Sequence, residues 1–276
     1  MRRIRRALLR LAVWVVLLAV LFPILWMVLT SVKSADISQT LPPVWVFSPT
    51  LSNYADVLSG HTYTSQAFGA LLAHSAVVTL ASTLLALAVG VPAAYAIARV
   101  RFRGKRFTAM WILSTIMFPP AVSVVPVFIF AARLKLMDTY PVLIVPYAAF
   151  GLPIVVWMLR SSIRQIPVEI EEAAMVDGAS RLALIRRIVL PLLLPGIVAA
   201  ALLCAMLSWN EFLFALALTR SHVQTAPVGI NEFTSMYGTQ WGDLTAAATV
   251  TVAPILILTL ILRRRLVEGL TFGAVK

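Results

Sequence analysis

Six long runs of the chain contain no Asp, Glu, Lys or Arg and consist mainly of apolar residues. A helix crosses a hydrocarbon core of ~30 Å with roughly 20 apolar residues, because each residue rises about 1.5 Å. Every run, from 19 to 32 residues long, meets that length. We therefore predict an all-α membrane protein with transmembrane helices at about 11–32, 70–98, 108–132, 139–159, 188–210 and 244–262.

The segment 160–187 between the fourth and fifth runs carries a different pattern, with signals for two short helices. Pro167 suits the start of a helix, and Gly178 suits the residue just past its end. The first turns of this helix are acidic, as the helix dipole favours, with Glu169, Glu171 and Glu172. Ser180 is placed to cap a second helix. We predict a helix–turn–helix at the membrane surface.

The first of these helices has features of a docking site for another protein. Ala173 and Ala174 are small enough to let another backbone approach, and Glu171 and Glu172 place charge beside them. The alternative is an amphipathic linker that contacts only lipid headgroups. Such linkers carry basic residues on their polar face, and this helix is acidic. The pattern therefore favours protein docking.

Composition and charge narrow the class of protein and its orientation. Of 276 residues, 61% are hydrophobic and 12% charged, which excludes a disordered chain and a soluble enzyme. Of the Lys and Arg residues, 19 lie on the side of the termini and four on the other side. The excess of positive charge predicts that both termini are cytoplasmic. This distribution explains the net charge of +12 without a nucleic-acid partner.

Candidate chemistry inside the chain is sparse. The sequence has no phosphate-binding loop, no nucleophile elbow and no zinc-binding helix motif, and it has a single cysteine, Cys204. We expect no catalytic residue, no metal site and no cofactor. Polar stripes at helical spacing, Ser75–Thr79–Ser82 and Thr245–Thr249, are typical of contacts between helices, although lining of a pathway is the alternative. His74 is expected at a helix interface.

The end of the fifth run holds the strongest candidate for a substrate contact. Trp209, Asn210 and Glu211 combine an aromatic ring with planar polar groups that suit sugar hydroxyls. An interfacial anchor is the alternative. Consecutive helical residues point about 100° apart, and no Gly or Pro marks a break here. We therefore expect one or two of the three to face a pathway, Asn210 and Glu211 before Trp209.

The segment 172–191 resembles the loop E-A-A-x(3)-G-x(9)-I-x-L-P of ABC importer permeases at every defined position. Other pieces are similar to the carbohydrate-uptake class of maltose and trehalose transporter type, and the six predicted spans fit its maltose-type second permease. Those pieces are Leu51–Tyr54, Ala93–Arg99, Ser208–Phe212 and Gly269–Lys276.

The resemblance implies the type I importer permease fold and a division of labour among subunits. The coupling helix that seats in an ATPase subunit would hold Glu172, Ala173, Ala174 and Gly178. The tail at the ATPase interface would hold Gly269, Leu270, Thr271 and Gly273. Implied partners are a second permease, a dimer of cytoplasmic ATPases that binds the ATP and Mg, and an extracytoplasmic sugar-binding protein.

The resemblance also implies the cargo, a di- or oligosaccharide moved across the cell membrane. The first alternative is uptake of glycerol 3-phosphate or a glycerophosphodiester. An anionic cargo calls for positive charge along its path, and the six spans contain no Lys or Arg. The second alternative is a membrane-embedded transferase. Such an enzyme needs a catalytic group, and the candidate, Glu211, has no partnering His or second carboxylate near it in the sequence.

Overall fold

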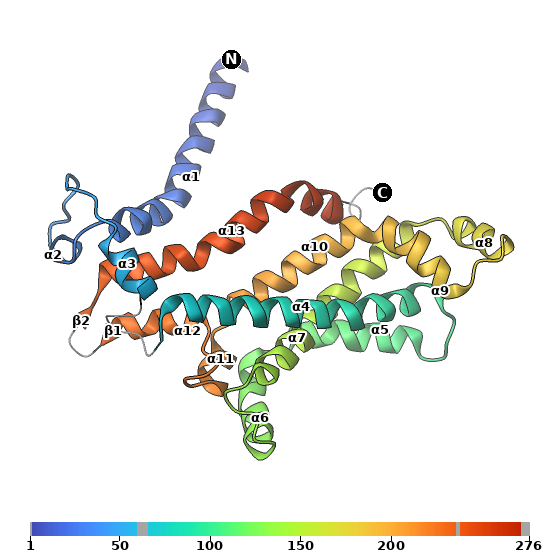
Figure 1. The fold of residues 1–276 in the computed structure, drawn as a ribbon. Coiled ribbons are helices and arrows are strands. Elements are labelled where there is room, and N and C mark those ends of the chain that lie inside the picture. Colours follow the sequence, from blue (N-terminus) through green and yellow to red (C-terminus); the bar gives the residue numbers. More distant parts are fainter. Residues whose placement is uncertain (1, 60–65, 236–237, 272–276) are drawn as a thin grey trace. The chain divides into compact units, whose positions relative to one another are not determined.

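The computed structural model describes residues 2–59, 66–235 and 238–271, with side chains for residue 6 and for 8–263 within these ranges. The chain folds almost entirely into helices (Figure 1). The α-helices are α1 (Arg2–Ser31), α2 (Ala35–Ser38), α3 (Ser52–Ser59), α4 (Phe68–Arg99), α5 (Lys105–Ser114), α6 (Pro120–Arg133), α7 (Tyr140–Gln165), α8 (Val168–Val176), α9 (Arg181–Leu184), α10 (Leu190–Trp209), α11 (Leu213–Leu218), α12 (Ala226–Gly229) and α13 (Trp241–Thr271). The shorter elements are the 3-10 helices η1 (Thr115–Met117) and η3 (Ile230–Phe233), the π-helix η2 (Ile185–Val189) and a hairpin of β1 (Thr234–Ser235) and β2 (Gly238–Thr239).

Five of the described helical segments are long and apolar enough to cross a membrane. They are Leu8–Ser31, Phe68–Arg99, Tyr140–Gln165, Arg181–Trp209 and Trp241–Arg263. Helices α5 and α6 can be counted together as a sixth span. This span is broken, because the two helical segments meet at an angle of 95°. The span predicted over 108–132 therefore corresponds to two helical segments joined at a sharp bend. Pro119 and Pro120 cause the break, since proline forces the residue before it into extended backbone and lacks an N–H.

The chain forms two compact units, one of which comprises residues 1–72 and 228–253. In this unit α3 is fastened to the end of α1. The side-chain amide of Asn53 donates to the backbone oxygens of Ser31 and Lys33 at 2.8 and 2.7 Å. The Lys33 ammonium lies over the ring of Trp26, 4.6 Å from its centroid. Gly242 is required beside Asn53, because a Cβ there would lie 2.8 Å from the amide nitrogen.

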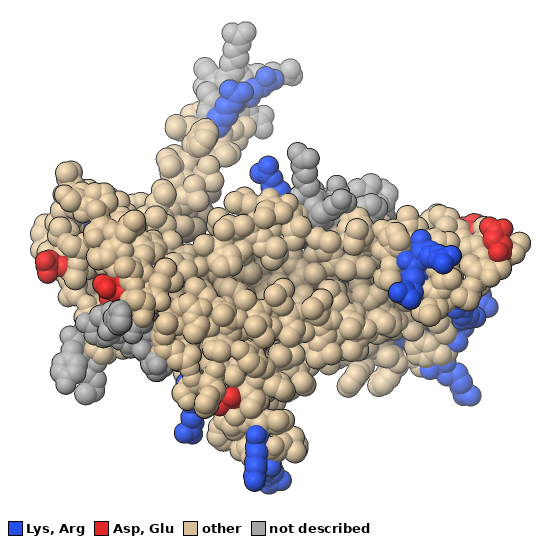
Figure 2. Space-filling model, in the orientation of Figure 1, with Lys and Arg blue, Asp and Glu red and all other residues tan. Residues whose placement is uncertain are grey.

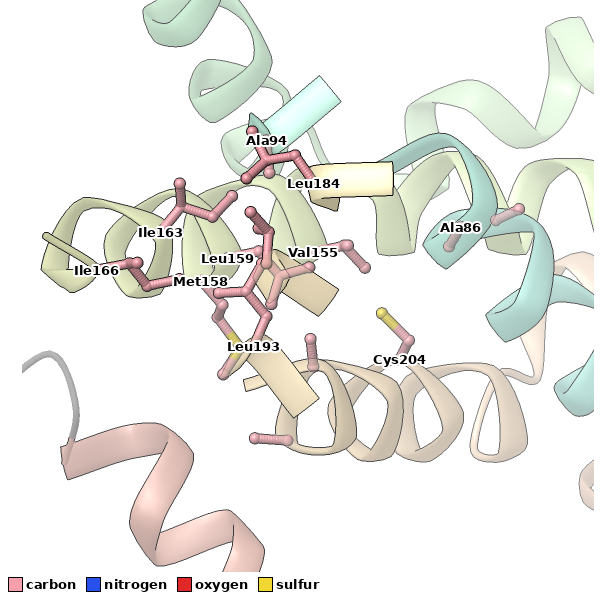
Figure 3. Close-up of a cluster of buried hydrophobic side chains, with 14 of the residues drawn as sticks. Ala86, Ala94, Val155, Met158, Leu159, Ile163, Ile166, Leu184, Leu193 and Cys204 are labelled. Carbon is pink, nitrogen blue, oxygen red and sulfur yellow. The ribbon is translucent and has the colours of Figure 1, made fainter. Parts of the chain in front are cut away.

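The second unit comprises residues 73–227 and 254–276, and its core lies where α7 packs along α10. Figure 3 shows this cluster, in which Val155, Leu159 and Ile163 of α7 are fully buried together with Leu193 of α10. Gly151 lets the two helices approach closely, since a Cβ on it would lie 3.1 Å from the sulfur of Cys204. The same cluster extends to Ala174 in α8, so the core reaches the predicted docking helix.

Two of the three residues in the polar stripe on α4 make the predicted contacts between helices of the second unit, whereas the buried hydroxyl of Thr79 has no partner within the described part of the chain. Ser82 donates to Ser208 on α10 at 3.0 Å, and Ser75 accepts from the backbone N–H of Ala226 at 2.8 Å. His74 bonds the phenol oxygen of Tyr140 at 2.7 Å, as expected for an interface histidine. The stripe on α13 differs, because Thr245 and Thr249 donate to carbonyls of their own helix.

Candidate functional site

The segment from Pro167 to Ser180 folds as its sequence predicts. Pro167 directly precedes α8, and Gly178 follows its last residues with φ +85°. The N–H groups of Gly178 and Ala179 bond the carbonyls of Met175 and Ala174, which closes the helix end in the arrangement that needs glycine. Ser180 then caps α9 by accepting from the N–H of Ala183. These local signals fix α8 as a separate short helix.

The two adjacent carboxylates of α8 have different surroundings. Glu171 is 4% exposed, and one of its oxygens accepts from Arg99 Nε at 2.6 Å. Its other oxygen accepts from the phenol of Tyr95 at 2.9 Å. Arg99 also donates to the carbonyl oxygen of Ile166, where α7 ends. The side chains of Arg99 and Glu171 therefore tie α8 to the end of α4.

The residues predicted to dock on a partner divide between the surface and the interior. Glu172, Ala173 and Gly178 are exposed. Helix α8, which these residues belong to or directly follow, lies at a tip of its unit (Figure 1). Ala174 is 8% exposed and packs into the core of this unit. The expectation that Glu171 and Ala174 lie on the docking face is wrong, because the helix turns both residues toward its own unit.

The helix ends directly after Trp209, although the sequence predicts that it continues through Glu211. α10 ends at Trp209 and α11 begins at Leu213. The carboxylate of Glu211 accepts from the backbone N–H groups of Phe214 and Ala215 at 3.1 to 3.3 Å, and so caps α11. The amide of Asn210 donates to the Met206 carbonyl at 2.7 Å, which closes the end of α10. Side chains, rather than Gly or Pro, therefore make this break.

The break after α10 and the break between α5 and α6 border the same cavity in the second unit. The cavity holds about 330 Å³, within the usual range for small-molecule sites. Glu211 contributes to its wall together with Tyr147, whose phenol donates to the carboxylate at 2.7 Å. The other lining residues are Thr115, Ile116, Phe118, Pro120, Phe150, Gly151, Ile154, Leu207, Ser208 and Phe214.

The three candidate substrate residues therefore have unequal positions. Glu211 lines the cavity, whereas neither Trp209 nor Asn210 does. Trp209 is 7% exposed within the fold, and the amide of Asn210 bonds its own helix. Of the three, Glu211 is therefore the residue that lines this cavity, and a substrate contact at any of them stays a prediction.

Several residues of these sites were missed by sequence reasoning. Tyr95 and Arg99 belong to one of the pieces that carry the family resemblance, but no local signal pairs them with Glu171. Tyr147 lies in a span without other polar neighbours, where a phenol is an ordinary buried residue. A buried Tyr hydroxyl needs a partner, and that requirement was the available signal. Of the residues predicted for the tail, Gly269, Leu270 and Thr271 lie in α13, whereas Gly273 falls outside the described residues.

A third cluster fastens the loop after α11 to the loop before α7. The carboxylate of Asp138 accepts four backbone N–H groups, those of residues 220–223, at 2.9 to 3.1 Å. Partial burial favours the neutral acid, but the four donors outweigh it and lower the pKa of Asp138 to about 2. The carboxylate thus holds the loop that follows α11 in place.

We expect this anchor to make stability depend on pH. Because the folded pKa lies below the ordinary value of 3.8, the stabilisation is complete above about pH 4 and is lost as the pH falls toward 2. The loss should amount to about 1–2 kcal/mol, since the carboxylate is partly exposed to solvent. Thermal unfolding of the solubilised protein between pH 5 and pH 2 measures it. Asp138→Asn should remove most of this dependence, and an unchanged dependence in that variant would contradict the assignment.

Comparison with known proteins agrees with this architecture. Residues 86–271 match the family described as "Binding-protein-dependent transport system inner membrane component". The trehalose/maltose transport system permease protein MalG of Thermococcus litoralis is 37% identical over 93% of this chain and 91% of its own length. The trehalose transport system permease protein SugB of Mycobacterium tuberculosis is 38% identical, covering 93% and 92%.

A solved structure shares the fold. A chain of a bacterial ABC transporter for the import of the acidic polysaccharide alginate superposes with a TM-score of 0.77 at 23% identity, over 95% of this chain and 96% of that chain. The family match covers most of the chain, including both helix breaks and the whole segment around α8. The chain therefore belongs to the family of inner membrane components of binding-protein-dependent transport systems, with the fold of a type I ABC importer permease.

Proposed function

We propose that the chain is the maltose-type second permease subunit of an importer that moves a neutral di- or oligosaccharide. The cavity between the two helix breaks carries this proposal. Four aromatic rings suit the C–H faces of a sugar, and the carboxylate of Glu211 and the hydroxyls of Tyr147 and Ser208 suit its hydroxyl groups. Broken helices that line a cavity are a common device at the substrate sites of transporters. Relatives named for trehalose and maltose transport support the same class of cargo.

The charge in the cavity separates this proposal from import of glycerol 3-phosphate. An anionic cargo would need a cation in the wall, and the lining residues include Glu211 but no Lys or Arg. Cells that produce the complete transporter should take up a labelled neutral disaccharide such as trehalose or maltose. Unlabelled sugar should compete for uptake, and glycerol 3-phosphate should not. Competition by glycerol 3-phosphate alone would refute the neutral cargo.

We further propose that energy comes from partner subunits and that this chain is not itself an enzyme. In this scheme both termini are cytoplasmic, the exposed face of α8 and the C-terminal tail contact a dimer of ATPases, and a second permease and a sugar-binding protein complete the importer. We also propose that residues 1–276 form a single transmembrane permease domain, as expected where no shift in composition divides the chain, and that this domain holds no cofactor. The exposed end of α8 supports the docking role, because Glu172 and Ala173 are accessible to a partner. Glu171 is buried in its own unit and is not available for such a contact.

Reversing the charge at the tip of α8 should uncouple transport from ATP hydrolysis. Glu172→Lys is expected to lower uptake roughly tenfold or more, because like charges in a docking surface cost several kcal/mol. The amount of protein in the membrane should stay normal, since Glu172 is exposed. Uptake, membrane content and co-purification of the ATPase measure this. Glu169→Lys is the matched control, because Glu169 is also exposed on α8 but lies outside the predicted motif. Equal loss in both variants would exclude a specific role of Glu172.

A further inference from the structure

A group of basic side chains gathers where α4, α5 and α7 come together. Arg101 follows α4, Lys105 begins α5, and Arg160 and Arg164 lie in the last turns of α7. Lys105 lies close enough to the three arginines for their charges to repel its own. None of the four forms an ion pair within the described part of the chain, where Glu171 is occupied by Arg99. No described carboxylate therefore pairs directly with any of these four cations.

Two of these groups have hydrogen-bond donors left over. The Nε–H of Arg160 is buried and has no partner among the described residues. The Lys105 ammonium donates to the carbonyls of Ala98 and Val100, at 3.2 and 3.0 Å, and an ammonium has three donors. The buried Nε–H of Arg160 without a partner costs free energy, and repulsion among the neighbouring like charges adds to that cost. An anion at this point would relieve both costs.

The location favours the phosphate of a membrane lipid over a free anion. α4 and α7 are both long enough to span the membrane, and Arg99 joins their ends through Glu171 and Ile166. Because both helices end here after a membrane-spanning length, the cluster lies within reach of lipid headgroups. α5, which begins at Lys105, also exposes Phe107, Met110 and Trp111 by 74%, 61% and 61%, on one face at i, i+3 and i+4 spacing. That face can hold an acyl chain beside the phosphate.

We propose that Arg101, Lys105, Arg160 and Arg164 form a site for the headgroup phosphate of an anionic phospholipid. On the face drawn in Figure 2, Lys and Arg side chains lie around the end of the second unit that carries α8, and the Asp and Glu side chains visible at that end lie at its tip. Basic pockets between membrane helices bind anionic headgroups in this way. The site is independent of the sugar cavity, since the two share no residue. The lipid would hold the ends of α4 and α7 together next to α8.

Native mass spectrometry of the detergent-purified complex with its partner subunits tests the proposal. Added phosphatidylglycerol should bind saturably, and phosphatidylcholine should bind more weakly. Inorganic phosphate should not displace the lipid, because it lacks the acyl chain. Arg160→Gln with Arg164→Gln should weaken phosphatidylglycerol binding by about fivefold for each charge removed. Arg160→Lys keeps the charge and should cause a smaller loss, so it remains informative if the double variant does not assemble.

Arg103→Gln is the matched control, because Arg103 is exposed in the same loop as Arg101 but is not among the cations around Lys105. Its lipid binding should equal that of the parent. Equal binding of phosphatidylglycerol by the parent and all variants would overturn the proposal. Displacement of the lipid by inorganic phosphate would overturn it too, in favour of a soluble anion. Lipid binding by the permease subunits purified without the ATPase, but not by the complete complex, would overturn it in favour of a contact with the ATPase.

Discussion

Arg99→Ala is expected to abolish transport and to destabilise the protein. The substitution leaves the carboxylate of Glu171 buried without its cation, and breaking such a pair costs about 3–5 kcal/mol. The carbonyl of Ile166 also loses its donor, so the ends of α4 and α7 should separate locally. Thermal unfolding of the solubilised chain measures the first effect. Sugar uptake by the complete transporter measures the second.

A double variant separates coupling from folding in this experiment. Arg99→Met with Glu171→Met removes both charges, and replacing a buried pair with apolar side chains is often neutral for stability. The double variant should therefore unfold close to the parent, while its uptake per ATP hydrolysed stays low because α8 is no longer fastened to α4. Arg103→Ala, an exposed control in the same loop, should change neither quantity. Full recovery of uptake in the double variant would show that the pair serves folding alone.

The contrast between Glu171 and Glu172 shows why sequence predicted the helix but not its roles. Pro167, Gly178 and Ser180 act on neighbouring backbone groups, so the limits of α8 could be predicted from the chain alone. Adjacent helical residues point about 100° apart, so only one of two consecutive glutamates can face the interior. Which one does so depends on Arg99, 72 positions away in the sequence. Helical periodicity relates only residues within one helix, so it cannot reveal a contact between residues this far apart in the sequence.

The two helix breaks show the same division between local and distant causes. The break between α5 and α6 has a local cause in Pro119 and Pro120. The charge-free run around them is long enough for one span, so the sequence predicts a single helix. The break after Trp209 has no such cause. Glu211 caps α11 while it bonds Tyr147 of α7, a residue 64 positions away. Sequence reasoning identified Glu211 as a candidate by its charge beside a span, but the cavity that it lines depends on packing between helices.

Glu211→Ala is expected to raise the sugar concentration for half-maximal uptake about tenfold or more, because a hydrogen bond to a charged group is worth about 1.5–3 kcal/mol. The variant also removes the cap of α11 and leaves the Tyr147 phenol without a partner. Some loss of stability is therefore expected with it. Asn210→Ala should have a smaller effect on uptake, since its amide bonds the Met206 carbonyl outside the cavity lining.

Tyr147→Phe isolates the cavity from the helix cap. It removes one hydroxyl from the wall and leaves the bonds from Glu211 to the N–H groups of Phe214 and Ala215 in place. If the cavity binds sugar, this variant should raise the concentration for half-maximal uptake while thermal stability and ATP hydrolysis in the absence of sugar stay near those of the parent. If Tyr147→Phe and Glu211→Ala both show the uptake kinetics of the parent, the hydrogen bond between Tyr147 and Glu211 serves only to stabilise the fold. In that case Glu211 would be the cap of α11, and the sugar would cross the membrane along another wall of the pathway.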